Sequence, residues 1–150
     1  MKISIVSGGF DPIHIGHLQL MEDSRLLSDK LIVIINNDNW LIKKKDFCFM
    51  KEQDRLRLTK ALKCVDDATL TKHKPNDEDV SVCNVLRELK ELFKNDNLIF
   101  CNGGDRKQDN ISEYDLCTQL GIEMIFNVGG GKIQSSSELV KNANFSKHKL

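Results

Sequence analysis

The chain has 150 residues, of which 40% are hydrophobic and 29% are charged, and its formal net charge is zero. This length and composition predict a single globular domain, 1–150, that is large enough to bury its own core. The balanced charge argues against a general nucleic-acid-binding protein, and the longest strongly apolar run, 31–35, is far too short to span a bilayer, so we expect neither nucleic acid nor a membrane as a partner.

Strand-like and helix-like segments alternate along the chain. Apolar runs predict five strands, at 2–6, 30–35, 68–71, 98–101 and 123–128. Helical patterns predict five helices, at 15–27, 52–63, 80–93, 112–120 and 135–142. We expect Gly121 to be a helix C-cap, loops over 37–49 and 72–79, and a flexible tail over 143–150. This alternation predicts an α/β protein with a parallel sheet and helices on both faces.

The turn between the first strand and the first helix carries the strongest functional signal. It reads Gly-Gly-Phe-Asp-Pro-Ile-His-Ile-Gly-His over residues 8–17. A helix start has unpaired N–H groups and a positive dipole end, and glycines allow close approach, so the turn suits a phosphate. His14 and His17 share one helix face and can donate to phosphoryl oxygens. The alternatives are ordinary helix-start histidines and a zinc site, for which His73 and His148 lack a matching spacing.

Basic residues follow the second strand. The predicted loop carries Asp38 and three consecutive lysines at 43–45. Lysines beside a phosphate-binding turn can neutralise the charge that develops in phosphoryl transfer. Arg55 begins the next helix, and a guanidinium can contact phosphate through two hydrogen bonds at once. The alternatives are a solvated basic loop and a surface arginine.

Glycine-containing loops follow the fourth and fifth strands. Gly103-Gly104-Asp105 permits a tight turn beneath a ligand. Residues 129–137 read Gly-Gly-Gly-Lys-Ile-Gln-Ser-Ser-Ser, which combines backbone N–H groups, hydroxyl donors and a helix dipole in a second anion site. The spacing is not that of a Walker A loop. A serine N-cap after a flexible loop is the alternative.

The cysteines and the N-terminus indicate a reducing compartment. The five cysteines, at 48, 64, 83, 101 and 117, form an odd, scattered set without a C-x-x-C pair, which predicts free thiols. The first strand begins without a leader-like apolar region or cleavage site, so we expect no signal peptide. Together these features predict a cytoplasmic protein.

In combination these motifs resemble those of the small nucleotidyltransferases of the glycerol-3-phosphate cytidylyltransferase and heptose-1-phosphate adenylyltransferase type. Every defined position of the family pattern Gly-x-Phe-Asp-x-x-His-x-Gly-His is present at residues 8–17. The resemblance covers nearly the whole chain and implies a Rossmann-like, doubly wound sheet of five parallel strands. It also implies attack of a substrate phosphate on the α-phosphate of ATP or CTP, release of pyrophosphate, and Mg²⁺ bridging the phosphates.

The resemblance implies a role for each motif. His14, His17 and Lys44 are expected to be catalytic, and Asp38 and Arg55 to bind the acceptor. The residues expected to bind the nucleotide are Gly8, Gly9, Phe10, Asp11, Gly16, Asp105, Lys132, Ser135, Ser136 and Ser137. No metal-binding side chain is assigned.

Relatives of this kind are commonly homodimers. Phe47, Phe49 and Met50 border the lysine-rich segment and belong either to the core or to a partner surface.

Two departures from the family pattern bear on the substrates. Asp46 stands where the glycerol-phosphate branch has a second lysine, and Gly130 stands where cytidylyltransferases have an arginine. The missing arginine and Gly103-Gly104-Asp105 favour ATP over CTP. The alternatives are an adenylyltransferase for a nicotinamide, pantetheine or flavin mononucleotide precursor, a fragment of a class I aminoacyl-tRNA synthetase, and a nucleotide-sensing protein without catalysis.

Overall fold

A computed structural model describes residues 1–104 and 112–130, and its centre is a five-stranded sheet in the order β3-β2-β1-β4-β5. The strands are β1 (Lys2–Gly8), β2 (Lys30–Ile35), β3 (Asp67–Leu70), β4 (Asn97–Cys101) and β5 (Glu123–Ile125). All four pairings are parallel. The strand order reverses at β1, so the crevice beyond the carboxyl end of β1 lies where ligands bind in such sheets.

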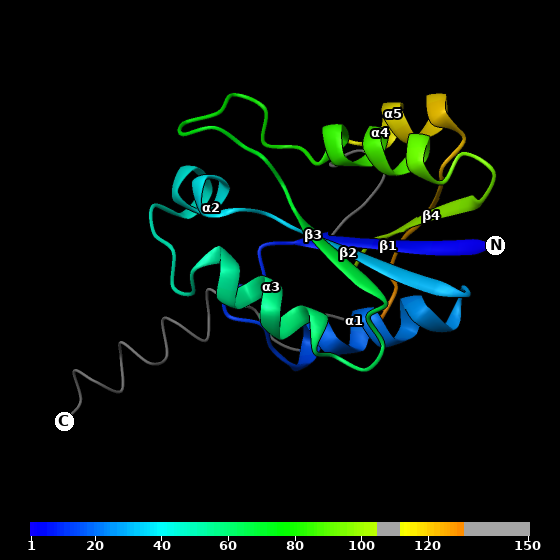
Figure 1. Ribbon diagram of the computed structural model, residues 1–150, viewed down its shortest axis with the longest axis horizontal. Helices are drawn as coiled ribbons and strands as arrows, with labels where there is room; N and C mark the ends of the chain where they lie inside the picture. The colour runs from blue at the N-terminus through cyan, green and yellow to red at the C-terminus, as the bar shows by residue number, and fades with distance from the viewer. Residues whose placement is uncertain (105–111, 131–150) are drawn as a thin grey trace.

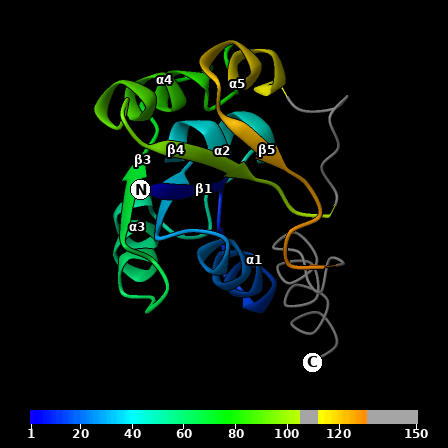
Figure 2. The same cartoon turned by 90° about the vertical axis from the view of Figure 1, so that its right-hand side faces the viewer.

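The helices form a layer on each face of the sheet. They are α1 (Ile15–Leu26), α2 (Asp38–Lys45), α3 (Glu52–Lys60), α4 (Cys83–Leu92) and α5 (Tyr114–Leu120). Helices α1 and α3 cover one face and α4 and α5 cover the other, while α2 lies by the carboxyl ends of the strands (Figures 1 and 2). The predicted doubly wound, Rossmann-like fold is confirmed.

An apolar core lies on each face of the sheet, because successive residues of a strand point to opposite faces. Ile32 and Ile34 of β2 pack toward Leu86 and Leu116, in the core beneath α4 and α5. The alternate β2 residues join the core over α1 and α3. Burial on both faces explains why these strands are continuous apolar runs in the sequence.

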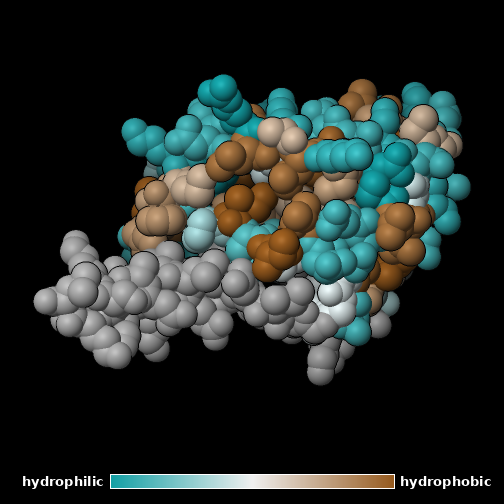
Figure 3. Space-filling model, turned by 90° about the horizontal axis from the view of Figure 1, so that it is seen from below, coloured by the Kyte–Doolittle hydropathy of each residue, from teal (hydrophilic) through white to brown (hydrophobic). Residues whose placement is uncertain are grey.

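The α1 and α3 side also exposes apolar side chains. Figure 3 shows them gathered in the middle of this side, and Ile15 of α1 and Leu58 of α3 are among the exposed large apolar residues. None of the helices in the described parts of the chain has the length and apolar character needed to cross a membrane.

Within the described residues, each predicted strand and helix has a counterpart in the structure, and the structure adds one helix that was not predicted. Residues 37–49 were expected to be a loop, but α2 occupies most of them. The Asn37 side chain caps this helix by accepting the Trp40 N–H at 3.0 Å, and Asp46 ends it in the left-handed conformation. Strand β5 is shorter than predicted, and Gly121 is the C-cap of α5 as expected. The predicted helix 135–142 and tail 143–150 lie outside the described residues.

Candidate active site

The turn between β1 and α1 brings His14 and His17 together. Their ring centroids are 3.6 Å apart and the ring planes differ by 21°. His14 is the N-cap of α1, and its Nδ1 accepts the Gly16 N–H at 3.1 Å. Nδ1 of His17 accepts the His14 N–H at 3.2 Å, which completes a reciprocal cap of the kind usually made by a hydroxyl and a carboxylate. Gly16, expected to bind nucleotide, therefore uses its N–H within the cap.

These hydrogen bonds fix which ring nitrogen carries the proton. Because Nδ1 is the acceptor in both rings, the proton of each neutral imidazole is on Nε2. The two side chains are therefore a pair of Nε2–H donors at the N-terminal end of a helix. Such donors, together with the helix dipole, suit the oxygens of a phosphate.

Phe10 packs against the histidine pair through His17. It is buried, has a left-handed backbone with φ of 53°, and meets the His17 ring edge-on at a centroid distance of 4.9 Å. A Cβ on Gly8 would come within 2.9 Å of Cζ of Phe10, and a Cβ on Gly9 within 3.0 Å of Cδ2 of Leu41. Both glycines therefore allow close packing around the turn.

Asp11 holds the backbone that leads into α3. The side chain is buried, and its two carboxylate oxygens accept the N–H groups of Phe49 and Met50. Asp11 was expected to bind nucleotide, but the structure engages both of its oxygens with protein backbone.

Arg55 was expected to bind the acceptor phosphate, but it lies in the interior and is 1% exposed. Its Nε donates to the Met50 carbonyl at 2.8 Å, and its Nη1 donates to the carbonyls of Gly9 and Asn36. Its Nη2 donates to Oδ1 of Asp38 at 2.7 Å. The guanidinium is thus surrounded by acceptors from its own chain, and it presents no surface to a substrate.

Asp38 has a second partner in Cys48. The thiol lies 3.0 Å from Oδ1 of Asp38 and donates to it. Burial, followed by this hydrogen bond, raises the pKa of Cys48 from 9.0 to about 11, so the thiol keeps its proton near neutral pH. The carboxylate expected at the acceptor site is thus held by two protein donors.

Lys44 lies in the last turn of α2 and is exposed.

Helix α2 is attached to the segment between β3 and α4. Nδ2 of Asn37 donates to the His73 carbonyl at 3.0 Å, and Nε1 of Trp40 donates to the Val80 carbonyl at 2.8 Å. Nζ of Lys43 donates to Oδ1 of Asn76 at 2.8 Å. The lysines therefore project from a fixed helix instead of a loop.

Of the second predicted anion site, 129–137, only Gly129 and Gly130 are among the described residues. Asp105, Lys132, Ser135, Ser136 and Ser137 lie outside them. The start of this site passes close to α1. A Cβ on Gly129, which has φ of +84°, would come within 3.1 Å of Cα of Leu20. This close approach places residue 129 beside α1, the helix that His14 caps.

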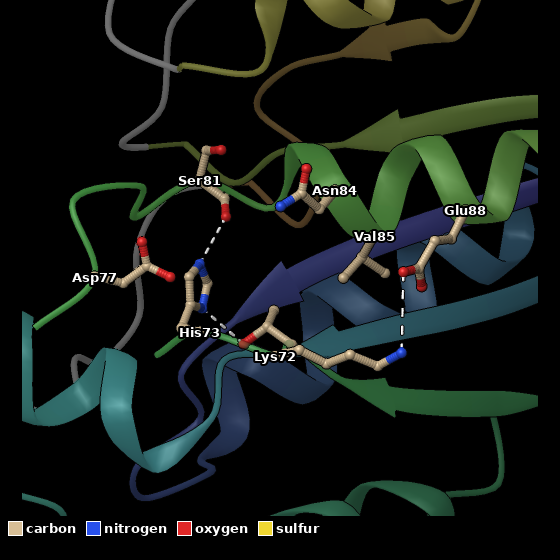
Figure 4. A pocket seen from close by; sticks show the side chains of 8 residues that line it. Lys72, His73, Asp77, Ser81, Asn84, Val85 and Glu88 are labelled. Atoms are coloured by element: carbon tan, nitrogen blue, oxygen red, sulfur yellow. Dashed lines mark hydrogen bonds and ion pairs between the residues drawn. The ribbon is translucent and has the colours of Figure 1, made fainter. Parts of the chain in front are cut away.

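A pocket with mostly polar lining residues, which no sequence motif indicates, lies between the end of β3 and the start of α4 (Figure 4). Its lining residues are Thr71, Lys72, His73, Asp77, Ser81, Asn84, Val85 and Glu88. Nε2 of His73 donates to the Ser81 carbonyl at 2.9 Å, and its Nδ1 accepts from the Thr71 hydroxyl at 2.8 Å. This segment matches no motif, and the only available signal was its place at the carboxyl edge of the sheet.

The parallel sheet with a His-x-Gly-His turn at the end of its central strand is the fold of Rossmann-like nucleotidyltransferases. The chain belongs to the cytidylyltransferase-like family, whose model matches residues 5–81.

Curated relatives are similar over different lengths of the chain. The bifunctional protein HldE of Desulfatibacillum aliphaticivorans is 28% identical over 137 residues, which is 90% of this chain and 26% of that protein. An FAD synthase of Methanoculleus marisnigri is 46% identical over 66 residues, which is 44% of each chain. The chain thus spans between a quarter and a half of the length of these relatives.

Solved structures show the same fold. A lipopolysaccharide core biosynthesis protein of Thermoplasma volcanium superposes with a TM-score of 0.66 at 24% identity, over 84% of this chain and 95% of that one. A putative nicotinate-nucleotide adenylyltransferase of Vibrio parahaemolyticus gives a TM-score of 0.66 at 16% identity, over 97% and 88%. The family and the fold predicted from the motifs are confirmed.

Proposed function

We propose that this chain is a nucleotidyltransferase that moves AMP or CMP from ATP or CTP to a small phosphorylated acceptor and releases pyrophosphate. The observation that carries the proposal is the reciprocal cap of His14 and His17, which holds two imidazole donors in a fixed orientation at the start of α1. Donors held in this way need no reorganisation when charge develops on a phosphoryl oxygen, and this is the main source of catalysis in such transfers.

The reaction needs no covalent enzyme intermediate. An oxygen of the acceptor phosphate attacks the α-phosphorus of the nucleotide, and the bond to the oxygen that bridges to the β-phosphate breaks. Pyrophosphate leaves with that electron pair. His14 and His17 donate to α- and β-phosphate oxygens, and Lys44 adds a positive charge over the transferring group.

The remaining nucleotide contacts are assigned to the glycine-rich turn and to the C-terminal motif. In this proposal Gly8, Gly9 and Phe10 shape the turn, Asp105 and Lys132 bind the nucleotide, and residues 135–137 hold its β- and γ-phosphates. The nucleotide enters as its Mg²⁺ complex, so the ion is part of the substrate. In residues 1–104 and 112–130, no cluster of three or more His, Cys, Asp or Glu side chains is placed to hold a metal, and no step is assigned to one.

The acceptor that we favour is a sugar or polyol phosphate, with ATP as the donor. The similarity to HldE over 90% of the chain supports this choice. The second candidate acceptor is flavin mononucleotide, which is supported by 46% identity to an FAD synthase over a shorter stretch. We further infer that residues 1–150 form a single domain. We also infer a cytoplasmic location, which the five free thiols support.

Pyrophosphate release tests the proposal. It is measured with each of the four nucleoside triphosphates against a panel of sugar, polyol and amino-alcohol phosphates, flavin mononucleotide, nicotinamide mononucleotide and phosphopantetheine. We expect release only when a suitable acceptor is present, with the acceptor-free reaction as the control. Nucleotide binding without release across the panel would favour a nucleotide-sensing protein and would overturn the proposal.

A further inference from the structure

One peptide unit, that of Met50, is held from both sides by buried charged groups. Its N–H donates to Oδ1 of Asp11, and its carbonyl accepts from Nε of Arg55 at 2.8 Å. The neighbouring N–H of Phe49 donates to the other oxygen of Asp11. The connection between α2 and α3 is therefore fixed by a carboxylate from 39 residues earlier in the chain and by a guanidinium from α3 itself.

The same guanidinium reaches the phosphate-binding turn. Nη1 of Arg55 donates to the Gly9 carbonyl at 2.8 Å and to the Asn36 carbonyl at the end of β2. Nη2 donates to Asp38 in the first turn of α2. A buried charge is tolerated only when acceptors surround it, and the planar fork of arginine can meet several at once where a lysine cannot.

These contacts bracket Phe10. Its predecessor Gly9 is bound through its carbonyl and its successor Asp11 through its carboxylate, so the backbone on both sides of Phe10 is held. The Phe10 ring in turn packs edge-on against His17. A continuous path of contacts therefore runs from Arg55 to one of the two histidine donors.

We propose that Asp11 and Arg55 are positioning residues that set the geometry of the nucleotide-phosphate site through the Met50 peptide, and that neither binds a substrate. This inference rests on the proposed nucleotidyl transfer. It replaces the roles expected for them from the sequence, nucleotide binding for Asp11 and acceptor binding for Arg55.

The test compares Asp11→Asn, Arg55→Lys, Arg55→Met and the Asp11→Asn/Arg55→Met double variant with the wild type. Arg57→Met is the matched control, because Arg57 is on the same helix but exposed. Three quantities are measured: amide hydrogen exchange at Phe49 and Met50, the dissociation constant of the nucleotide without acceptor, and kcat with the KM for each substrate.

If Asp11 and Arg55 are positioning residues, substituting either one should loosen the Met50 peptide and weaken nucleotide binding together. Exchange at Phe49 and Met50 should accelerate at least about tenfold, and the nucleotide should bind roughly tenfold more weakly, as expected for one buried charged hydrogen bond. kcat should fall, while the KM for the acceptor changes by no more than about threefold. The double variant should lose little more than the worse single variant, because both substitutions release the same peptide. Arg57→Met should match the wild type.

The opposite pattern would overturn the inference. If Arg55→Lys raised only the KM for the acceptor and left exchange at Met50 and nucleotide binding unchanged, Arg55 would be a substrate ligand. Full additivity in the double variant would show that the two residues do not act through one peptide. The exchange measurement requires no substrate. It therefore still tests whether Asp11 and Arg55 hold the Met50 peptide if the wild type releases no pyrophosphate. Arg55→Lys and Asp11→Asn serve if Arg55→Met does not fold.

Discussion

His14 and His17 orient one another: the backbone N–H of His14 donates to Nδ1 of His17 at 3.2 Å, and the two rings stack with centroids 3.6 Å apart. The cap and the proposed catalytic donors are thus the same two side chains. Substitutions can separate these two tasks, because Asn places an acceptor near the position of Nδ1 and has nothing at the position of Nε2.

We expect His17→Asn and His17→Ala to lower kcat by a similar factor, roughly 10² to 10³, because both remove one transition-state donor. His17→Ala should also lower the free energy of unfolding by about 1 kcal/mol, since the cap bond is lost, whereas His17→Asn should lose less. Steady-state kinetics and thermal unfolding measure the two effects. Wild-type turnover in either variant would remove His17 from the mechanism.

Lys44→Ala should lower kcat by roughly ten- to a hundredfold, because its charge matters most as the phosphoryl group transfers. The dissociation constant of the nucleotide should change less than kcat. Lys60→Ala is the control, since Lys60 is an exposed lysine at the end of α3. A loss confined to nucleotide affinity would show that Lys44 only contributes to ground-state binding.

The thiol of Cys48 should make stability fall at alkaline pH. Burial and the hydrogen bond to Asp38 raise the pKa of the folded thiol from 9.0 to about 11. Between these values the folded protein binds more protons than the unfolded chain, so the contribution is complete below pH 9.0 and is lost as the pH rises to about 11. Cys48→Ser keeps a hydroxyl donor for Asp38 but does not titrate in this range.

Denaturant unfolding at several pH values tests this contribution. The free energy of unfolding of Cys48→Ser should fall less steeply than that of the wild type above pH 9.0. The other groups that titrate here are common to both proteins and cancel in the comparison. Parallel curves would show that Cys48 has the same pKa in the folded and unfolded states.

Phe47 and Phe49, expected to be either core or partner surface, are 45% and 60% exposed. We propose that they contribute to a homodimer contact beside α2, and that the Phe47→Ser/Phe49→Ser variant shifts the protein toward monomer with lower activity per chain. Light scattering over a concentration series, run with the activity assay, measures both. Leu92→Ser is the control, because Leu92 is exposed at the end of α4, away from α2. A wild type that is monomeric throughout, with constant specific activity, would exclude the dimer.

The sheet and the histidine turn were predictable because their signals are local. Each central strand is an apolar run, and residues 8–17 carry their pattern within ten positions. Helix α2 was missed because only Leu41 among its eight residues is buried, and its cap and attachments define it more than its periodicity does. The burial of Arg55 was not predictable because it depends on carbonyls as far away as Gly9, 46 residues earlier in the chain.

The attachment of α2 bears on the speed of the catalytic cycle. Because Asn37 and Trp40 bind this helix to the segment before α4, we expect Lys44 to reach a bound nucleotide by rotation of its side chain about its own bonds. Rotamer exchange of an exposed side chain takes picoseconds to nanoseconds, whereas the closing of a lid takes microseconds to milliseconds. The movement of the Lys44 ammonium group to the nucleotide is then too fast to limit turnover. A higher solvent viscosity should not slow this movement.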